Sequence, residues 1–217
     1  MKDAADPINR RSKAPASFID ICNPMRKTAC VIMILSVLTA GSVVFPAPVR
    51  IGEKVGDIRL PDTSGKMQSL DSYAGKVVVL AFWSFKCPTA LAWNDRLTAL
   101  QTRYGSQGVV LLAVDSSSNE SEVEIRRNAA NLNVAFPILV DSEGVVAEKL
   151  GATLTPSLCI LDRSGILRYR GAWDNREKVG DKKREAYAES AVENILAGQA
   201  VANPETQVSG CSIRRRP

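Results

Sequence analysis

The chain has 217 residues, of which 24% are charged and 45% hydrophobic, a composition that suits one globular domain with terminal extensions. It contains no histidine, which excludes Ser–His and Cys–His nucleophile activation and every histidine-bearing zinc site. The formal net charge of +5 comes with basic residues gathered at both termini. This pattern is typical of solvation or targeting, so we expect no nucleic-acid partner.

Residues 29–45 form an almost continuously apolar segment, and Arg26 and Lys27 precede it. A basic flank before a hydrophobic stretch is typical of an export signal, and this stretch is short for a membrane span of about 20 residues. We expect residues 1–50 to be an export signal or membrane anchor plus linker, with membrane contact if the apolar segment is not cleaved; a buried core helix is the alternative. We expect the chain after residue 50 to be exported to the periplasm or another extracytoplasmic compartment. Met25 begins a typical signal sequence, so we hypothesise that translation starts there.

From residue 51 onward, short apolar runs alternate with helical patterns. Turn signals over 51–71 predict a small hairpin, and the β-branched run 77–83 predicts a buried strand. The further expected elements are a helix to about Tyr104, a strand over 109–114, a helix to about Leu132, a strand over 136–140, a short helix over 145–150, a hairpin of 157–161 with 166–169, and a helix over 181–198. This order predicts an α/β domain over 51–198 with a central sheet. The polar composition of residues 199–217 predicts a flexible tail.

The helix that ends near Leu132 has two candidate starting points. Ser117 with Glu120, and Ser121 with Glu124, both have the spacing of a capping box, in which a serine and a glutamate satisfy each other's backbone N–H groups. The sequence leaves open which of the two pairs begins the helix.

Cys87 lies where the predicted strand 77–83 gives way to a helix, and Pro88 fits the first helical position, which favours proline. Cys87 would then cap the helix and face unpaired N–H groups at the positive end of the helix dipole. Both effects favour the thiolate, which is the reactive form, and Lys86 adds a nearby positive charge. We therefore predict that Cys87 is a reactive nucleophile.

The other cysteines divide into three kinds. Cys22 and Cys30 lie in or before the apolar segment and leave with it if it is cleaved. Cys159 lies inside an apolar strand run, where a cysteine behaves as a small hydrophobe. Cys211 lies in a polar tail without a packing reason, and export favours disulfides. We hypothesise that Cys87 attacks an oxidised substrate and Cys211 resolves the product, because a tail of roughly fifteen residues, each spanning about 3.3 Å, can reach back.

Several motifs in this order resemble the thioredoxin superfamily. The run Phe82-Trp83-x-x-x-Cys87-Pro88 resembles its active-site strand, and Leu154-Thr155-Pro156 resembles the cis-proline loop that faces the reactive cysteine. Residues 161–167 are similar to the closing hairpin. The match is closest to the redoxin group, which includes the alkyl hydroperoxide reductase/thiol-specific antioxidant family and exported thioredoxin-like proteins. The segments 169–174 and 210–213 resemble a peroxiredoxin-like subgroup with a C-terminal cysteine.

This resemblance implies a three-layer thioredoxin-like fold, with a central mixed sheet flanked by helices and an N-terminal hairpin extension. The departures from the family matter as much as the matches. Ala90 stands where thioredoxin has its second motif cysteine, and Ala81 stands where thioredoxin has a buried acid. Ser84 fits the hydroxyl position of the peroxiredoxin motif, but Leu80 replaces its proline. Neither parent therefore fixes the substrate, and both a disulfide and a peroxide stay open.

The resemblance also implies which residues support the thiol. Thr155 and Pro156 would face Cys87, while Ser84 and either Arg168 or Arg170 would orient a peroxide. The expected partners are protein disulfides, peroxides, or a reducing thiol protein as electron donor, with no cofactor and no bound metal. The other class of function is a non-catalytic binding or assembly module at the membrane, which a measured Cys87 pKa near 8.5 would favour. Metal delivery is a weaker third alternative.

Overall fold

The computed structural model describes residues 47–175 and 185–215. The chain divides into two compact units, Met1–Phe45 and Pro46–Pro217. The first unit lies outside the described residues, as do the predicted export segment 29–45 and the proposed start at Met25. Within the part of the chain that the structure describes, no helix has both the length and the apolar character to cross a membrane.

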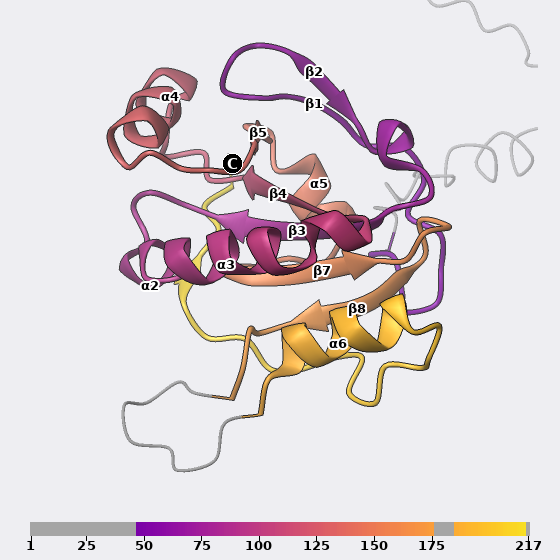
Figure 1. The fold of residues 1–217 in the computed structure, drawn as a ribbon. Helices are drawn as coiled ribbons and strands as arrows, with labels where there is room; N and C mark the ends of the chain where they lie inside the picture. Colours follow the sequence, from indigo (N-terminus) through magenta and orange to yellow (C-terminus); the bar gives the residue numbers. More distant parts are fainter. Residues whose placement is uncertain (1–46, 176–184, 216–217) are drawn as a thin grey trace, which may run out of the picture. The chain divides into compact units, whose positions relative to one another are not determined.

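A five-stranded mixed sheet forms the centre of the second unit (Figure 1). Its strands in spatial order are β5 (Ile138–Val140), β4 (Val109–Asp115), β3 (Val77–Trp83), β7 (Ser157–Leu161) and β8 (Leu167–Gly171). Strands β3, β4 and β5 run parallel, and β7 and β8 are antiparallel to their neighbours. All seven residues of β3 are buried, because this apolar strand lies in the middle of the sheet with both faces covered.

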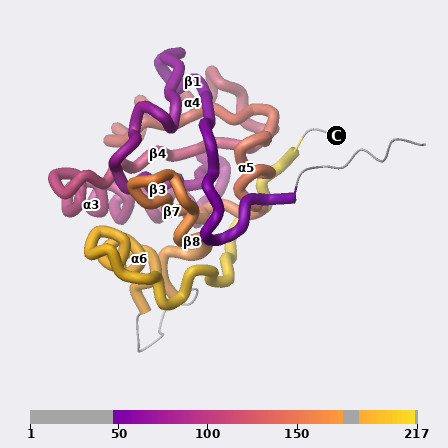
Figure 2. Tube along the Cα trace, turned by 90° about the vertical axis from the view of Figure 1, so that its right-hand side faces the viewer, coloured from indigo at the N-terminus to yellow at the C-terminus, as the bar shows by residue number. Residues whose placement is uncertain are grey.

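Helices cover both faces of the sheet, and Figure 2 shows α3 and α6 on one side of the strands and α5 on the other. The described helices are η1 (Leu70–Tyr73), α2 (Pro88–Leu91), α3 (Asn94–Tyr104), η2 (Gly105–Gln107), α4 (Glu122–Asn131), α5 (Val145–Lys149) and α6 (Tyr187–Leu196). Alternate residues of β3 enter two separate cores: Val79 packs with α3 and α6, and Leu80 packs with α5. The predicted three-layer arrangement is confirmed.

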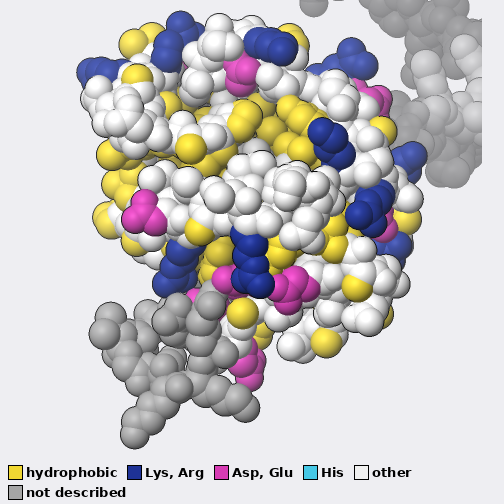
Figure 3. Space-filling model, viewed as in Figure 1, with side chains coloured by type: hydrophobic (Ala, Val, Ile, Leu, Met, Phe, Trp, Pro, Cys, Tyr) yellow, Lys and Arg dark blue, Asp and Glu magenta, His cyan; other side chains and the backbone are white. Residues whose placement is uncertain are grey.

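Two ion pairs join helix α3 to α6 and to the segment that follows β8. Arg103 in α3 lies 3.0 Å from Glu193 in α6, and Arg96 lies 3.3 Å from Asp174. Figure 3 shows basic and acidic side chains meeting over hydrophobic atoms in the strip below α3. The Arg103–Glu193 pair is exposed on both sides and contributes little to stability, whereas Asp174 is buried beneath Arg96.

The predicted N-terminal hairpin is present as β1 (Arg59–Pro61) and β2 (Met67–Ser69), which pair antiparallel. Asp62 in its turn forms a bridge with Leu139 of β5. The hairpin therefore extends from the β5 edge of the sheet, on the side where Figure 1 draws it.

The structure divides one expected helix and decides between two candidate starts of another. The helix after Cys87 is divided into α2 and α3, and Trp93 is the N-cap of the second piece. Helix α4 begins at Ser121, where the capping box with Glu124 is formed in both directions. The alternative box of Ser117 and Glu120 is not formed, because the Glu120 carboxylate accepts hydrogen bonds from another loop.

The C-terminal segment 199–215 is fixed against the domain, in contrast to the flexible tail that the sequence suggests. Strand β9 (Cys211–Ser212) pairs antiparallel with β6 (Leu154–Thr155), and Ile213 is buried. The polar composition concealed this because the attachment is made by backbone groups, which an unpaired strand edge offers to any sequence. Gly210 lies at φ 154°, and a Cβ there would fall 2.1 Å from Thr155 O, so only glycine permits this approach.

Candidate active site

Cys87 is the N-cap of α2, and Pro88 occupies the first turn, as the sequence predicts. The backbone N–H of Cys87 donates to Ser84 O at 3.2 Å, which closes the turn between β3 and the helix. The side chain is completely buried, and its Sγ lies 3.1 Å from Thr155 O, to which the thiol donates. The reactive position is therefore a strand-to-helix turn that faces the loop before β7.

The Thr155–Pro156 peptide bond is cis, as the family resemblance implies. It separates the short strand β6 from β7, whose first residue Ser157 pairs with Phe82 of β3. This pairing brings the loop of residues 154–156 to the end of β3 from which Cys87 follows. Thr155 and Pro156 are thus where the sequence analysis placed them.

Cys211 reaches the same place from the other end of the chain. It is the β9 partner of Thr155, and Thr155 Oγ1 lies 3.4 Å from Cys211 O. The two thiols also influence each other's ionisation: Cys211 lowers the pKa of Cys87, and Cys87 raises the pKa of Cys211. In the structure both are free thiols.

The pKa values of the Cys87 and Cys211 thiols are shifted in opposite directions. Burial opposes ionisation of Cys87, but hydrogen bonds with the side chains of Cys211 and Thr155 and with the backbone of Ala90 and Cys211 outweigh it, so the pKa of Cys87 lies below its ordinary 9.0. The hydrogen bond with Cys87, with a further contribution from burial, raises the pKa of Cys211 to about 11. Cys87 is therefore the thiol that ionises first.

Cys159 has no part in this site. It lies in β7 opposite Leu80 and belongs to the core on the α5 side, while Cys87 belongs to the core on the α3 side. Burial raises the pKa of Cys159 to about 12. The sheet separates the two sulfurs, which confirms Cys159 as a packed hydrophobe.

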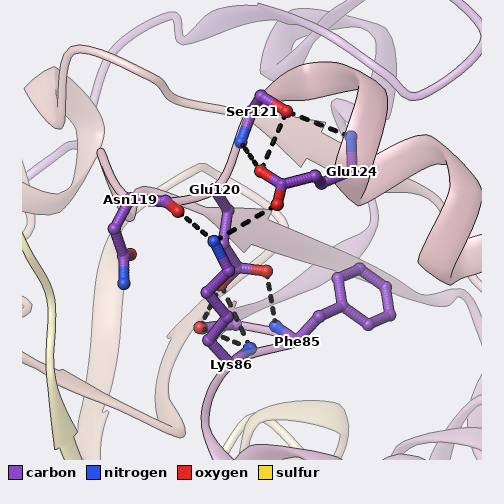
Figure 4. Close-up of polar contacts among 7 residues, drawn as sticks. Phe85, Lys86, Asn119, Glu120, Ser121 and Glu124 are labelled. Carbon is purple, nitrogen blue, oxygen red and sulfur yellow. Dashed lines mark hydrogen bonds and ion pairs between the residues drawn. The ribbon is translucent and has the colours of Figure 1, made fainter.

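Two of the predicted supporting residues point elsewhere. Lys86 was expected to place its charge near the thiol, but its Nζ donates to Asn119 O and lies 3.4 Å from Glu124 (Figure 4). The buried Ser84 hydroxyl donates to Glu120. Both side chains are therefore taken up by the loop before α4, and the hydroxyl expected to orient a peroxide already has an acceptor.

Neither arginine of the closing strand contacts Cys87. Arg168 donates from Nε to Asp162 at 2.6 Å, beside the turn that joins β7 to β8. Arg170 donates to Glu205 and to the carbonyls of Val49 and Leu150. Because Cys87 adjoins the opposite end of β7, the supporting role expected of Arg168 is wrong.

Residues 51–170 match the model of the AhpC/TSA family, and this is more than half of the chain. The chain belongs to the AhpC/TSA family. The thioredoxin-like protein YneN of Bacillus subtilis is 29% identical over 120 residues, which cover 55% of this chain and 70% of that protein. The thiol-disulfide oxidoreductase ResA of Geobacillus thermodenitrificans is 28% identical over 120 residues, covering 55% and 68%.

Solved structures with the same fold are similar to this chain. A hypothetical protein of Sinorhizobium meliloti has a TM-score of 0.70 and 26% identity, covering 77% of this chain and 96% of that one. The exposed lipoprotein thioredoxin of Streptococcus pneumoniae has a TM-score of 0.53 and 26% identity, covering 64% and 99%. The fold is thioredoxin-like, and the chain is a thiol oxidoreductase of this type.

Sequence reasoning missed two buried carboxyl groups beside this AhpC/TSA-family site, those of Asp115 and Glu120, which are 1% and 4% exposed. Asp115 ends β4 opposite Trp83, and burial together with the nearby charge of Glu120 raises its pKa to about 8. Asp115 is therefore a buried acid at the end of the strand next to β3, two residues beyond the partner of Ala81. The available signal was position, because parallel strands end at the same edge of a sheet and Asp115 directly follows a buried run.

Proposed function

We propose that the chain exchanges electrons between thiols and disulfides, with Cys87 as the nucleophile and Cys211 as the resolving cysteine. The observation that carries this proposal is the pairing of β9 with β6. It sets Cys211 opposite Thr155, whose carbonyl lies 3.1 Å from Cys87 Sγ. A second thiol at this place compensates for Ala90, the residue that removes the usual second cysteine of the motif.

In the first step the Cys87 thiolate attacks one sulfur of a substrate disulfide. A bond forms between Cys87 Sγ and that sulfur, the substrate's S–S bond breaks, and the other substrate sulfur leaves as a thiolate that takes a proton from solvent. The lowered pKa of Cys87 supports this role, because its hydrogen-bonding partners favour the thiolate at a lower pH than an ordinary cysteine requires.

In the second step Cys211 releases the substrate. Its pKa is raised to about 11 chiefly by the hydrogen bond with Cys87, so Cys211 stays protonated while Cys87 is free. Consumption of Cys87 in the mixed disulfide removes that interaction, and the pKa of Cys211 returns toward its ordinary value. Cys211 then loses its proton to solvent and attacks Cys87 Sγ, which forms the Cys87–Cys211 disulfide and releases the second substrate thiolate. The substrate gains two electrons, and a reducing thiol protein returns two to the chain.

A peroxide is the second candidate substrate, and the complete burial of Cys87 favours it, because a small oxidant reaches a buried sulfur more easily than a protein disulfide does. Here Cys87 attacks the O–O bond, becomes a sulfenic acid and releases an alcohol or water; condensation with Cys211 then releases a second water. Against it, the side chains of Ser84 and Arg168 are bonded to Glu120 and Asp162. We therefore prefer the disulfide as substrate and a catalytic role over a non-catalytic module.

We also propose that the chain acts outside the cytoplasm. The basic-flanked apolar segment 29–45 supports export, and so does the similarity to the pneumococcal exposed lipoprotein thioredoxin. Fractionation of cells that express the full chain tests this: we expect the mature protein in the extracytoplasmic fraction, and retention of the entire pool in the cytoplasm would contradict export.

Mass spectrometry without reductant tests the cysteine roles. The reduced full chain is treated with one equivalent of a model disulfide or of hydrogen peroxide, and the linked peptides and rates are compared with those of Cys87→Ser and Cys211→Ser. We expect a Cys87–Cys211 link in the wild type, formed faster with the disulfide, and Cys159→Ser as matched control should form it equally well. A Cys87–Cys159 link, or two free thiols after oxidation, would overturn the pairing, and faster reaction with peroxide would reverse the choice of substrate.

A further inference from the structure

The three residues between β3 and Cys87 form a turn whose backbone faces another part of the chain. Phe85 N donates to Glu120 Oε2 at 3.0 Å, and Lys86 N donates to Glu120 Oε1 at 3.3 Å. The Ser84 hydroxyl donates to the same Oε1. One carboxylate, 35 residues away in sequence, therefore holds every residue of the turn that delivers Cys87 to α2 (Figure 4).

Glu120 is itself fixed from several directions. Its backbone N–H donates to Ser117 O at 3.1 Å, and the next residue, Ser121, is the capped start of α4. The Lys86 side chain donates to Asn119 O and pairs with Glu124. Figure 4 shows Glu120 between these contacts, with its carboxylate directed at the backbone of Phe85 and Lys86. The turn and the loop before α4 are thus joined by side chains from both.

Burying an ionised carboxylate costs free energy unless hydrogen bonds compensate for the lost hydration. Glu120 is 4% exposed, and the adjacent Lys86 directs its ammonium at Asn119 and Glu124 instead of at this carboxylate. Hydrogen bonds from backbone N–H groups and a hydroxyl to a carboxylate are directional, and Glu120 accepts three of them from the turn. They compensate the burial only while the turn keeps this one conformation, so the carboxylate and the turn fix each other.

We infer that Glu120 is a positioning residue, which holds the turn Ser84–Lys86 and thereby fixes Cys87 at the start of α2 against Thr155. It touches neither the sulfur nor any substrate in this role. The inference deepens the proposed function, on which its relevance to catalysis rests.

Glu120→Gln distinguishes a positioning role from a purely electrostatic one, because the two roles predict opposite changes in the pKa of Cys87. Glutamine keeps the shape but has a single acceptor oxygen, so its NH₂ group would face a backbone N–H of the turn. If Glu120 acts through the turn, Glu120→Gln loosens Cys87 from its partners and raises the Cys87 pKa. If Glu120 acts only through its charge, loss of a nearby negative charge favours the thiolate and lowers the Cys87 pKa.

The measurement is the rate at which iodoacetamide alkylates Cys87, followed by peptide mapping from pH 5 to 10. For Glu120→Gln we expect the midpoint of the profile to rise by about one unit, with an alkylation rate at pH 7 lower by about tenfold. Glu120→Asp keeps the charge but shortens the reach, and we expect a shift in the same direction. It also serves as the second variant should the glutamine variant fold poorly.

Glu124→Gln is the matched control. Glu124 pairs with Lys86 and caps α4, but it does not contact the backbone of the turn. We expect this variant to lower the melting temperature by about 2–4 °C and to leave the alkylation profile of Cys87 unchanged. An unchanged or lowered midpoint in both Glu120 variants, or an equal rise in Glu124→Gln, would overturn the inference. Alkylation needs no substrate, so this result is independent of whether Cys87 and Cys211 form a disulfide.

Discussion

Cys87 and Cys159 are both buried, with exposed fractions of 0% and 1%. Nevertheless, the pKa of the Cys87 thiol is lowered and that of the Cys159 thiol is raised. Cys159 lies within β7, where its nearest polar contact is Leu150 O at 4.0 Å, and burial raises its pKa to about 12. Cys87 lies at the end of the sheet against Thr155 and Cys211, and its pKa is lowered. Burial alone therefore makes a thiol inert, and polar partners at the sheet edge are what reverse its effect.

The position of each cysteine along its strand explains the difference. Around Cys159 the backbone groups of β7 already pair with those of β3 and β8, so they offer the thiol little hydrogen bonding. A residue just beyond the strand meets the unpaired N–H groups of the next helix. The four predictions below test this contrast, beginning with the largest expected effect.

Cys87→Ser should lower the rate of disulfide reduction by at least about 10³-fold, because the nucleophile is lost. Cys159→Ala should leave the rate within about twofold and lower the free energy of unfolding by about 1 kcal/mol. Turnover with a model disulfide and a reducing thiol measures both. Equal losses of activity in the two variants would remove the distinction between the two cysteines.

Cys211→Ser should preserve the attack of Cys87 but prevent release of the product. We expect turnover to fall by about 100-fold, equivalent to about 2.7 kcal/mol in barrier height, while a mixed disulfide on Cys87 accumulates and is visible as added mass. Ser212→Ala is the control on the same strand, and a similar loss there would point to strand pairing instead of the thiol.

Asp115→Asn tests the effect of burial on the pKa of a carboxyl group, as the cysteine variants test it for a thiol. The pKa of Asp115 is raised to about 8, so the folded chain keeps a proton that the unfolded chain releases above about pH 4. The contribution of this group to stability is thus fully present below pH 4 and is lost as pH rises toward 8.

We expect Asp115→Asn to flatten this pH dependence and to raise the free energy of unfolding at pH 8 by up to about 5 kcal/mol, because a shift of about four pKa units is worth about 1.4 kcal/mol per unit. Urea denaturation at pH 4 and pH 8 measures it, and the pH 4 comparison is the internal control. A wild-type stability that stays constant between these pH values would refute the raised pKa.

Thr206→Val tests the attachment of the segment that carries Cys211 and should have the smallest effect. Thr206 Oγ1 lies 2.7 Å from the Tyr169 hydroxyl and accepts from Ala172 N at 3.0 Å. Loss of these hydrogen bonds should lower the free energy of unfolding by about 1 kcal/mol. The Cys87–Cys211 disulfide should also become slightly easier to reduce, as measured in a thiol redox buffer. An unchanged stability would show that the segment is held by its backbone pairing alone.

Much of the fold followed from local pattern. The apolar runs predicted β3, β4, β7 and β8, and Ser121 with Glu124 was one of two candidate starts of α4, the one that the structure uses. Within the site, Pro88 after Cys87 predicted a helix with the cysteine as its cap. These signals succeed because a buried strand or a capped helix start depends mainly on the residues within it.

The supporting residues could not be predicted in the same way. Lys86 looked like a partner of Cys87 because it is adjacent in sequence, yet its side chain reaches Asn119 and Glu124. Arg168 looked plausible as a cation on the closing strand, yet it lies beside the β7–β8 turn and bonds to Asp162. The direction of a long side chain depends on the acceptors around it, which come from distant parts of the chain.

By itself, the sequence determined the order of strands and helices, the family, and the placement of Cys87 at a helix start, because these depend on periodicity and on neighbouring residues. Only the tertiary structure decided which groups surround the sulfur. The polar segment that carries Cys211 is held by backbone pairing with β6, and Glu120 is buried beneath the turn by a contact across 35 residues. Backbone hydrogen bonds do not depend on side-chain identity, and contacts between distant residues leave no local pattern.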